Sequence, residues 1–190
     1  MRVYLITHVA TAQQRARDAT QWGLSDAGRA QAAALAAASF WATVEQVIVS
    51  SEAKAFLSVA SVVADRGLPV WVDSRLDELR RGGWVDGYGA QVAEMLAHPN
   101  SSVGEWEAAS AALERVCEAL ATIERRFAGK TVALVGHGLT LSLLRAHYLG
   151  LARVRYDDWV RLPFGAVAAV ELPGGRWIQD FPLAEPVRRG

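Results

Sequence analysis

Arg2-Val-Tyr-Leu-Ile-Thr-His-Val-Ala-Thr11 opens the chain with an apolar run that ends at a histidine and gives way to polar residues. Residues 3–6 are β-formers in nearly continuous apolar sequence, which is typical of a strand covered on both faces in an α/β sheet. Ligands of such sheets bind beyond the carboxyl ends of the strands. The pattern therefore predicts that His8 faces a ligand site.

A second segment repeats this layout far downstream. Thr131-Val-Ala-Leu-Val-Gly-His-Gly138 is an apolar run that ends at His137 between two glycines. A single histidine at the end of a strand is more often a hydrogen-bonded structural residue than a catalyst. Two histidines at matching positions favour a shared site, although the glycines could instead form only a tight turn from strand to helix.

The apolar patterns between and after these segments alternate between the strand period and the helix period. Strands are predicted over residues 44–50 and 70–72 and in a terminal hairpin. A first helix is predicted from the capping Ser25 to about residue 41, and further helices are predicted over residues 52–65, 91–97, 101–127 and 139–149. Short links between such elements predict an α/β three-layer sandwich, with a mainly parallel central sheet flanked by helices.

Length and composition limit what the chain can be. Its 190 residues suffice for one sizeable core and are few for two, so we expect a single domain over residues 1–190 with a frayed tail from 186. The 20 basic and 20 acidic side chains cancel, so no global field favours nucleic acid or an anionic membrane. A single cysteine, with no signal-peptide pattern and no long apolar span, predicts a cytoplasmic protein. Four scattered histidines show no metal-ligand spacing, so neither a metal nor a cofactor is expected.

The order of several short motifs resembles the histidine phosphatase superfamily, which includes the phosphoglycerate mutases. The motifs in this chain are His8 after its strand, Leu24-Ser-Asp-Ala-Gly-Arg-Ala-Gln31, Val47-Ile-Val-Ser-Ser51 with Lys54-Ala-Phe-Leu-Ser58, Asp77-Glu78, and Val135-Gly-His-Gly138. The likeness covers most of the chain, from residue 2 to about residue 150. It implies a phosphoglycerate mutase-like fold.

The resemblance also implies roles for individual residues. His8 would be the nucleophile and form a phosphohistidine, and His137, in its cationic form, would donate to a phosphate oxygen beside Gly138. Glu78 would be the general acid, although the adjacent Asp77 could serve instead, and both could simply be solvated charges paired with neighbouring arginines.

The chain departs from the family where cations are expected. The family signature Arg-His-Gly is replaced by Thr7-His8-Val9, and Lys54 stands where an arginine is usual. A lysine keeps the positive charge but lacks the fork that binds phosphate in a bidentate manner. Arginines from nearby loops could restore the missing guanidinium, or could be solvated surface charges; these are Arg15, Arg17, Arg80 and Arg81.

The favoured function is a metal-independent phosphatase acting on a small phosphorylated molecule or a phosphoprotein. The alternative is a family relative that binds a phosphorylated or other anionic ligand with little or no turnover. A mutase fits less well, because the chain is short and lacks the pocket arginine. Specificity would come from the charged, glycine-rich segment 74–89 and the helix beyond it, where Trp84, Tyr88 and Trp106 could be aromatic walls or core. A homodimer is possible.

Overall fold

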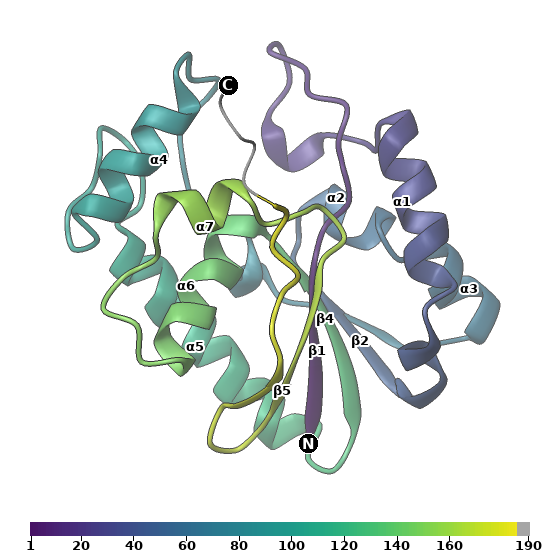
Figure 1. The fold of residues 1–190 in the computed structure, drawn as a ribbon. Coiled ribbons are helices and arrows are strands. Elements are labelled where there is room, and N and C mark those ends of the chain that lie inside the picture. The colour runs from purple at the N-terminus through teal and green to yellow at the C-terminus, as the bar shows by residue number, and fades with distance from the viewer. Residues whose placement is uncertain (186–190) are drawn as a thin grey trace.

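The computed structural model describes residues 1–185 and contains one six-stranded sheet between two layers of helices (Figure 1). The predicted tail from residue 186 lies outside the described residues. The strands are β1 (Arg2–Thr7), β2 (Gln46–Val49), β3 (Val70–Val72), β4 (Thr131–Gly136), β5 (Val167–Glu171) and β6 (Arg176–Gln179). The helices are α1 (Asp26–Ala36), α2 (Ala53–Leu57), α3 (Ala60–Arg66), α4 (Tyr88–Ala97), α5 (Ala109–Arg126), α6 (Gly138–Tyr148) and α7 (Tyr156–Val160), with 3-10 turns at Ala19–Gln21, Ser39–Thr43 and Ser74–Leu76.

The strands lie in the order β3-β2-β4-β1-β5-β6. The β3-β2, β2-β4 and β4-β1 pairs are parallel, whereas β5 and β6 add an antiparallel edge. The predicted α/β sandwich with a mainly parallel sheet is therefore confirmed, and so is the terminal hairpin.

Alternate residues of the central strands face opposite helical layers. Leu5 and Leu134 pack with α5 and α6, whereas Ile6 and Val135 pack with α1 and α3. Both faces of the sheet are thus covered, which explains why β1 and β4 are apolar at nearly every position. No helix within the described residues is both long and apolar enough to cross a membrane.

Three predicted helices have different limits in the structure. The first ends at Ala36 because the chain turns there and the Trp41 indole donates to the Leu35 carbonyl at 2.8 Å. The helix predicted from 101 begins only at Ala109, since Gly104 adopts a left-handed φ of 59°. The short helix expected from residue 91 begins earlier, at Tyr88.

The helix predicted over 52–65 is two helices, α2 and α3, interrupted at Ser58 and Val59. The Ser58 hydroxyl donates to the Lys54 carbonyl at 2.7 Å and accepts from the Val9 N–H at 2.9 Å. The break therefore fastens this segment to the residue that follows His8.

Candidate active site

Sheet register brings the two strand-end histidines together. β1 and β4 are adjacent and parallel, and Thr7 is opposite Gly136, so His8 and His137 leave the sheet at the same level. The His8 N–H donates to the Gly136 carbonyl at 2.9 Å. The two imidazole centroids lie 5.2 Å apart in an edge-on arrangement. The two histidines are therefore neighbours, as the two apolar segments predicted, although only His8 lines the adjoining cavity.

His8 is held in the form that a nucleophile requires. Its Nδ1 lies 2.8 Å from the Val9 carbonyl oxygen, and because that oxygen can only accept, Nδ1 carries the proton. Nε2 is left with its lone pair. Burial lowers the pKa of His8 from 6.5 to about 4, and the positive charge of Lys54 acts in the same direction. The imidazole is therefore neutral near pH 7.

His137 is completely buried behind His8. Its Nε2 lies 2.7 Å from the Ser50 hydroxyl, which already accepts from the Glu52 N–H at 3.3 Å, so the hydroxyl proton is free to point at Nε2. Its Nδ1 is buried and has no hydrogen-bond partner among the described residues. Burial holds the pKa of His137 well below 6.5, so the neutral form is favoured over the expected cation.

Glu78 lies at the amino end of α6, the helix that begins directly after His137. Its carboxylate accepts from the backbone N–H groups of Leu139 and Thr140, at 3.1 and 3.2 Å. Burial nevertheless raises the pKa of Glu78 above its usual value, and the nearby charge of Glu52 raises it further. The side chain is therefore suited to carrying a proton.

Asp77, the alternative acid, is directed elsewhere. Its two carboxylate oxygens accept from the backbone N–H and the hydroxyl of Ser51, each at 2.7 Å. Glu78 lines the same cavity as His8, whereas Asp77 does not. The geometry therefore favours Glu78 over Asp77.

His8 faces a cavity of about 380 Å³ that also contains two cationic side chains, Lys54 and Arg81. Lys54 is buried, pairs with Glu52 and donates to the Ala19 carbonyl at 2.6 Å. Arg81 donates to the Tyr88 hydroxyl at 2.6 Å. An anion bound beside His8 would meet these two positive charges.

Glu52 is the site residue that the sequence analysis missed. It is buried, pairs with Lys54, accepts from the Glu78 N–H at 2.7 Å and has an oxygen 3.6 Å from His137 Nε2. One signal could have found it: an acidic residue two positions before the candidate phosphate lysine and three positions after the end of a buried strand.

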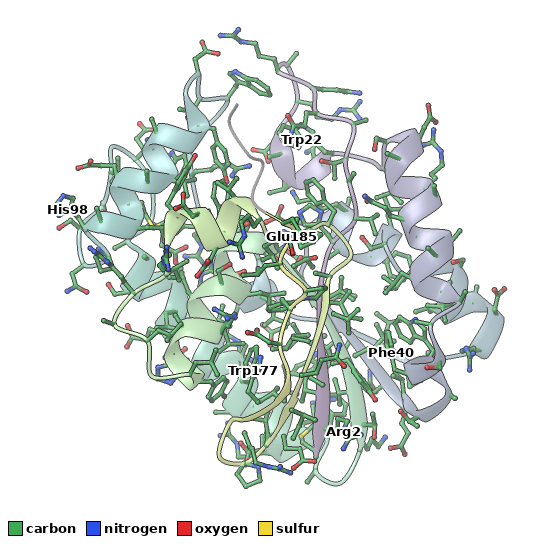
Figure 2. All side chains as sticks on the ribbon, viewed as in Figure 1. Arg2, Trp22, Phe40, His98, Trp177 and Glu185 are labelled. Atoms are coloured by element: carbon green, nitrogen blue, oxygen red, sulfur yellow. The ribbon has the colours of Figure 1, made fainter. Side chains whose placement is uncertain are left out.

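A second cavity of about 640 Å³ adjoins the first, and the two share Gln13, Trp22, Glu78, Arg81 and Tyr88 in their walls. Trp22 lies beyond the carboxyl end of β1, above the sheet in Figure 2. Trp84 and Tyr88 also line this second cavity, whereas Trp106 is buried in the core against Tyr88. Trp84 and Tyr88 are therefore aromatic walls of a cavity, and Trp106 belongs to the core.

Comparison with known proteins identifies the family. The model of the histidine phosphatase superfamily, branch 1, matches residues 3–181. The chain belongs to the histidine phosphatase superfamily. No curated protein sequence matches it.

Solved structures of histidine phosphatase-like proteins share the fold at low sequence identity. YhfR of Bacillus stearothermophilus is 22% identical with a TM-score of 0.75, and the match covers 97% of each chain. A mycobacterial glucosyl-3-phosphoglycerate phosphatase solved with VO3 is 23% identical with a TM-score of 0.75, over 97% of this chain and 99% of that one. A phosphoserine phosphatase mutant from Entamoeba histolytica, solved with phosphoserine, is 15% identical with a TM-score of 0.73, over 95% of each chain.

Thr7, at the position of the expected signature arginine, is held by two hydrogen bonds to the segment before β5. Its hydroxyl donates to the Pro163 carbonyl at 2.9 Å and accepts from the Ala166 N–H at 2.8 Å. The single hydroxyl proton is therefore already used, and Thr7 fastens the segment before β5 to the end of β1. Gly138 does line the His8 cavity, as predicted, with a Cβ position 3.4 Å from the Trp159 indole nitrogen.

Of the four loop arginines that could supply the missing guanidinium, Arg81 lines the His8 cavity and the other three do not. Arg15, Arg17 and Arg80 line the second cavity and not the His8 cavity. Arg15 is drawn away by an ion pair with Asp86 at 2.7 Å, and the backbone of Arg80 is fastened to Glu107. A role of Arg15, Arg17 and Arg80 in phosphate binding stays a prediction, and Arg81 is the arginine that lines the His8 cavity.

Within residues 1–185, no group of three or more His, Cys, Asp or Glu side chains is arranged to hold a metal ion. Metal independence remains a prediction.

Proposed function

We propose that this histidine phosphatase superfamily member is a metal-independent phosphomonoesterase that works through a phosphohistidine on His8. The observation that carries the proposal is the hydrogen bond from His8 Nδ1 to Val9. It leaves the lone pair on Nε2 of a neutral ring, in a cavity that also contains Glu78, Lys54 and Arg81. A nucleophile, an acid and cations are what phosphoryl transfer to histidine requires.

In the first step His8 Nε2 attacks phosphorus, and the bond between phosphorus and the ester oxygen breaks. Glu78 gives its proton to the departing oxygen, so the alcohol leaves neutral and Glu78 becomes a carboxylate. The raised pKa of Glu78 supports this role, because an acid that is still protonated near its working pH donates more readily.

In the second step water attacks the phosphohistidine, and the Glu78 carboxylate takes a proton from that water. The bond between Nε2 and phosphorus breaks, which releases inorganic phosphate and restores neutral His8. His137 would stabilise the phosphoryl oxygens by donating from Nδ1, the buried atom that has no partner among the described residues. A neutral imidazole can make this hydrogen bond, so the cationic form is not required.

A weakly active relative that mainly binds an anionic ligand is the second candidate, and two contacts favour it. The Thr7 hydroxyl proton is already used, and the charge of Lys54 is paired with Glu52. Losing one cation that acts on the transition state costs about 10² to 10³ in rate in comparable cases. The ligand in either case would be a small phosphorylated molecule or a phosphoprotein. A mutase ranks below both.

The experiment is release of phosphate from a panel of phosphomonoesters with EDTA present, using wild type, His8→Ala and His98→Ala. His98 is an exposed histidine that caps the carboxyl end of α4 and is the matched control. We expect His8→Ala to lose roughly three or more orders of magnitude in kcat and His98→Ala to keep wild-type turnover. Equal activity of the His8→Ala variant would sink the mechanism. Phosphate binding without turnover in the wild type would favour the binding protein.

A further inference from the structure

The second cavity lies where the leaving group of a phosphomonoester would extend. It shares Glu78 with the His8 cavity, and Glu78 is the side chain that would protonate the leaving oxygen. Its volume of about 640 Å³ is in the range of pockets that enclose drug-sized organic molecules. A substrate with a small alcohol portion would leave most of this space to water.

Two indoles form an apolar wall of this cavity. The Trp22 and Trp84 ring centroids are 6.2 Å apart, with 55° between the ring planes. Both N–H groups are already used, since Trp22 donates to the Arg17 carbonyl at 3.0 Å and Trp84 to Asp86 at 2.9 Å. Trp22 is only 9% exposed, so Trp84 presents most of the apolar surface, and the Arg15 guanidinium carbon lies 5.9 Å from the centroid of the Trp84 ring. Trp84 is 45% exposed, and a bound ring would remove this surface from water.

Side chains of both charge signs line this cavity, and two of its arginines are unpaired within the described residues. The guanidinium groups of Arg17 and Arg80 form no ion pair or hydrogen bond with the described residues, in contrast to that of Arg15. The carboxylates of Asp18 and Asp77 also line this cavity, and they accept from neutral groups, Asp18 from Thr20 and Asp77 from the neighbouring serine. A ligand in this cavity therefore meets two guanidinium groups that have no other partner in this part of the chain.

We propose that the second cavity binds the leaving group, and that the substrate is a phosphomonoester whose alcohol portion contains a flat aromatic ring and a second anionic group. The ring packs on Trp22 and Trp84, and the anion pairs with Arg17 and Arg80. This inference rests on the proposed function, since it assumes that the phosphate is attached beside His8.

The test compares three phosphates of primary alcohols with similar leaving-group chemistry: ethyl phosphate, 2-naphthylmethyl phosphate, and the latter with a carboxylate at position 6. We expect the wild-type kcat/KM to rise about tenfold from ethyl to naphthylmethyl, from aromatic packing and burial. The carboxylate should add a further three- to tenfold, roughly, from charge-assisted contacts.

Variants separate the two contributions. Trp84→Ala should bring the naphthylmethyl to ethyl ratio of kcat/KM close to one, and Trp84→Phe, which retains a ring, should restore part of it. The double variant Arg17→Gln/Arg80→Gln should remove the gain from the carboxylate. Arg29→Gln, which changes an exposed arginine on α1 outside both cavities, is the control and should keep both ratios.

The outcomes distinguish this inference from the proposed function. Equal kcat/KM for all three phosphates, lost in His8→Ala, would overturn the inference and leave the phosphatase intact. No turnover of any phosphate would overturn the phosphatase, and titration calorimetry with the carboxynaphthylmethyl alcohol then decides the cavity. If the wild type binds this alcohol and the Trp84→Ala variant binds it more weakly, the leaving-group site is supported. If the wild type does not bind the alcohol, the leaving-group site is overturned.

Discussion

At the scale of single residues, Glu52 connects several side chains of the candidate site. It pairs with Lys54, accepts from the Glu78 N–H and adds to the raised pKa of Glu78. We predict that Glu52→Gln, which keeps the size and an acceptor oxygen, lowers the pKa of Glu78. The proton needed for the leaving group is then lost at lower pH, so the alkaline limb of kcat/KM moves toward acid.

The same substitution leaves Lys54 without its carboxylate partner, so phosphate should bind more tightly, by roughly threefold to tenfold. The measurements are the pH profile of kcat/KM and competitive inhibition by phosphate. Glu45→Gln, an exposed residue that accepts from the Thr131 backbone, serves as the matched control. An unchanged alkaline limb and an unchanged phosphate inhibition constant would contradict the role of Glu52.

At the scale of elements, α1 supports the loop that follows His8. The Ser25 hydroxyl caps the helix by accepting from the Gly28 N–H at 3.0 Å, and the Ser25 N–H donates to the Ala10 carbonyl at 3.1 Å. A Cβ on Gly28 would lie 1.9 Å from that carbonyl oxygen. The helix and the loop therefore touch through backbone, and only glycine fits between them.

We predict that Gly28→Ala pushes the loop away from α1, destabilises the protein by about 1 to 3 kcal/mol and lowers kcat. Gly23→Ala is the control, because a Cβ there meets nothing within 4 Å and Gly23 has no positive φ. Urea unfolding and turnover measure both effects. If Gly28→Ala matched Gly23→Ala in both measurements, the contact would not hold the loop.

The elements also show how far the sequence could be interpreted. The strand ending at His8, the strand ending at His137 and the Ser25 cap follow from local pattern and were predicted correctly. The break at Ser58 depends on the Val9 N–H, which is distant in sequence, so local periodicity could not show it. Arg81 and Glu52 join the site through contacts with Tyr88, Lys54 and Glu78, and the short helix α7 has no periodic signal long enough to detect.

For the whole molecule, burying two neutral histidines makes folding depend on pH. The pKa of His8 is about 4 in the folded chain and 6.5 when exposed, and that of His137 is also lowered. At pH values between the folded and the unfolded pKa, the unfolded chain binds protons that the folded chain does not. The free energy of unfolding therefore falls as the pH falls. His8 alone accounts for up to about 3 kcal/mol of this loss, complete below pH 4.

We therefore predict that the urea midpoint falls steadily from pH 6.5 to pH 4, and that His8→Gln makes this fall shallower. Glu78 works in the opposite direction, because its raised pKa lets the folded chain keep a proton that the unfolded chain releases. Glu78→Gln should thus make the fall steeper, whereas His98→Gln, at an exposed position, should leave the slope unchanged. A midpoint that stays flat across this pH range in the wild type and in all three variants would show that neither histidine is held neutral by the fold.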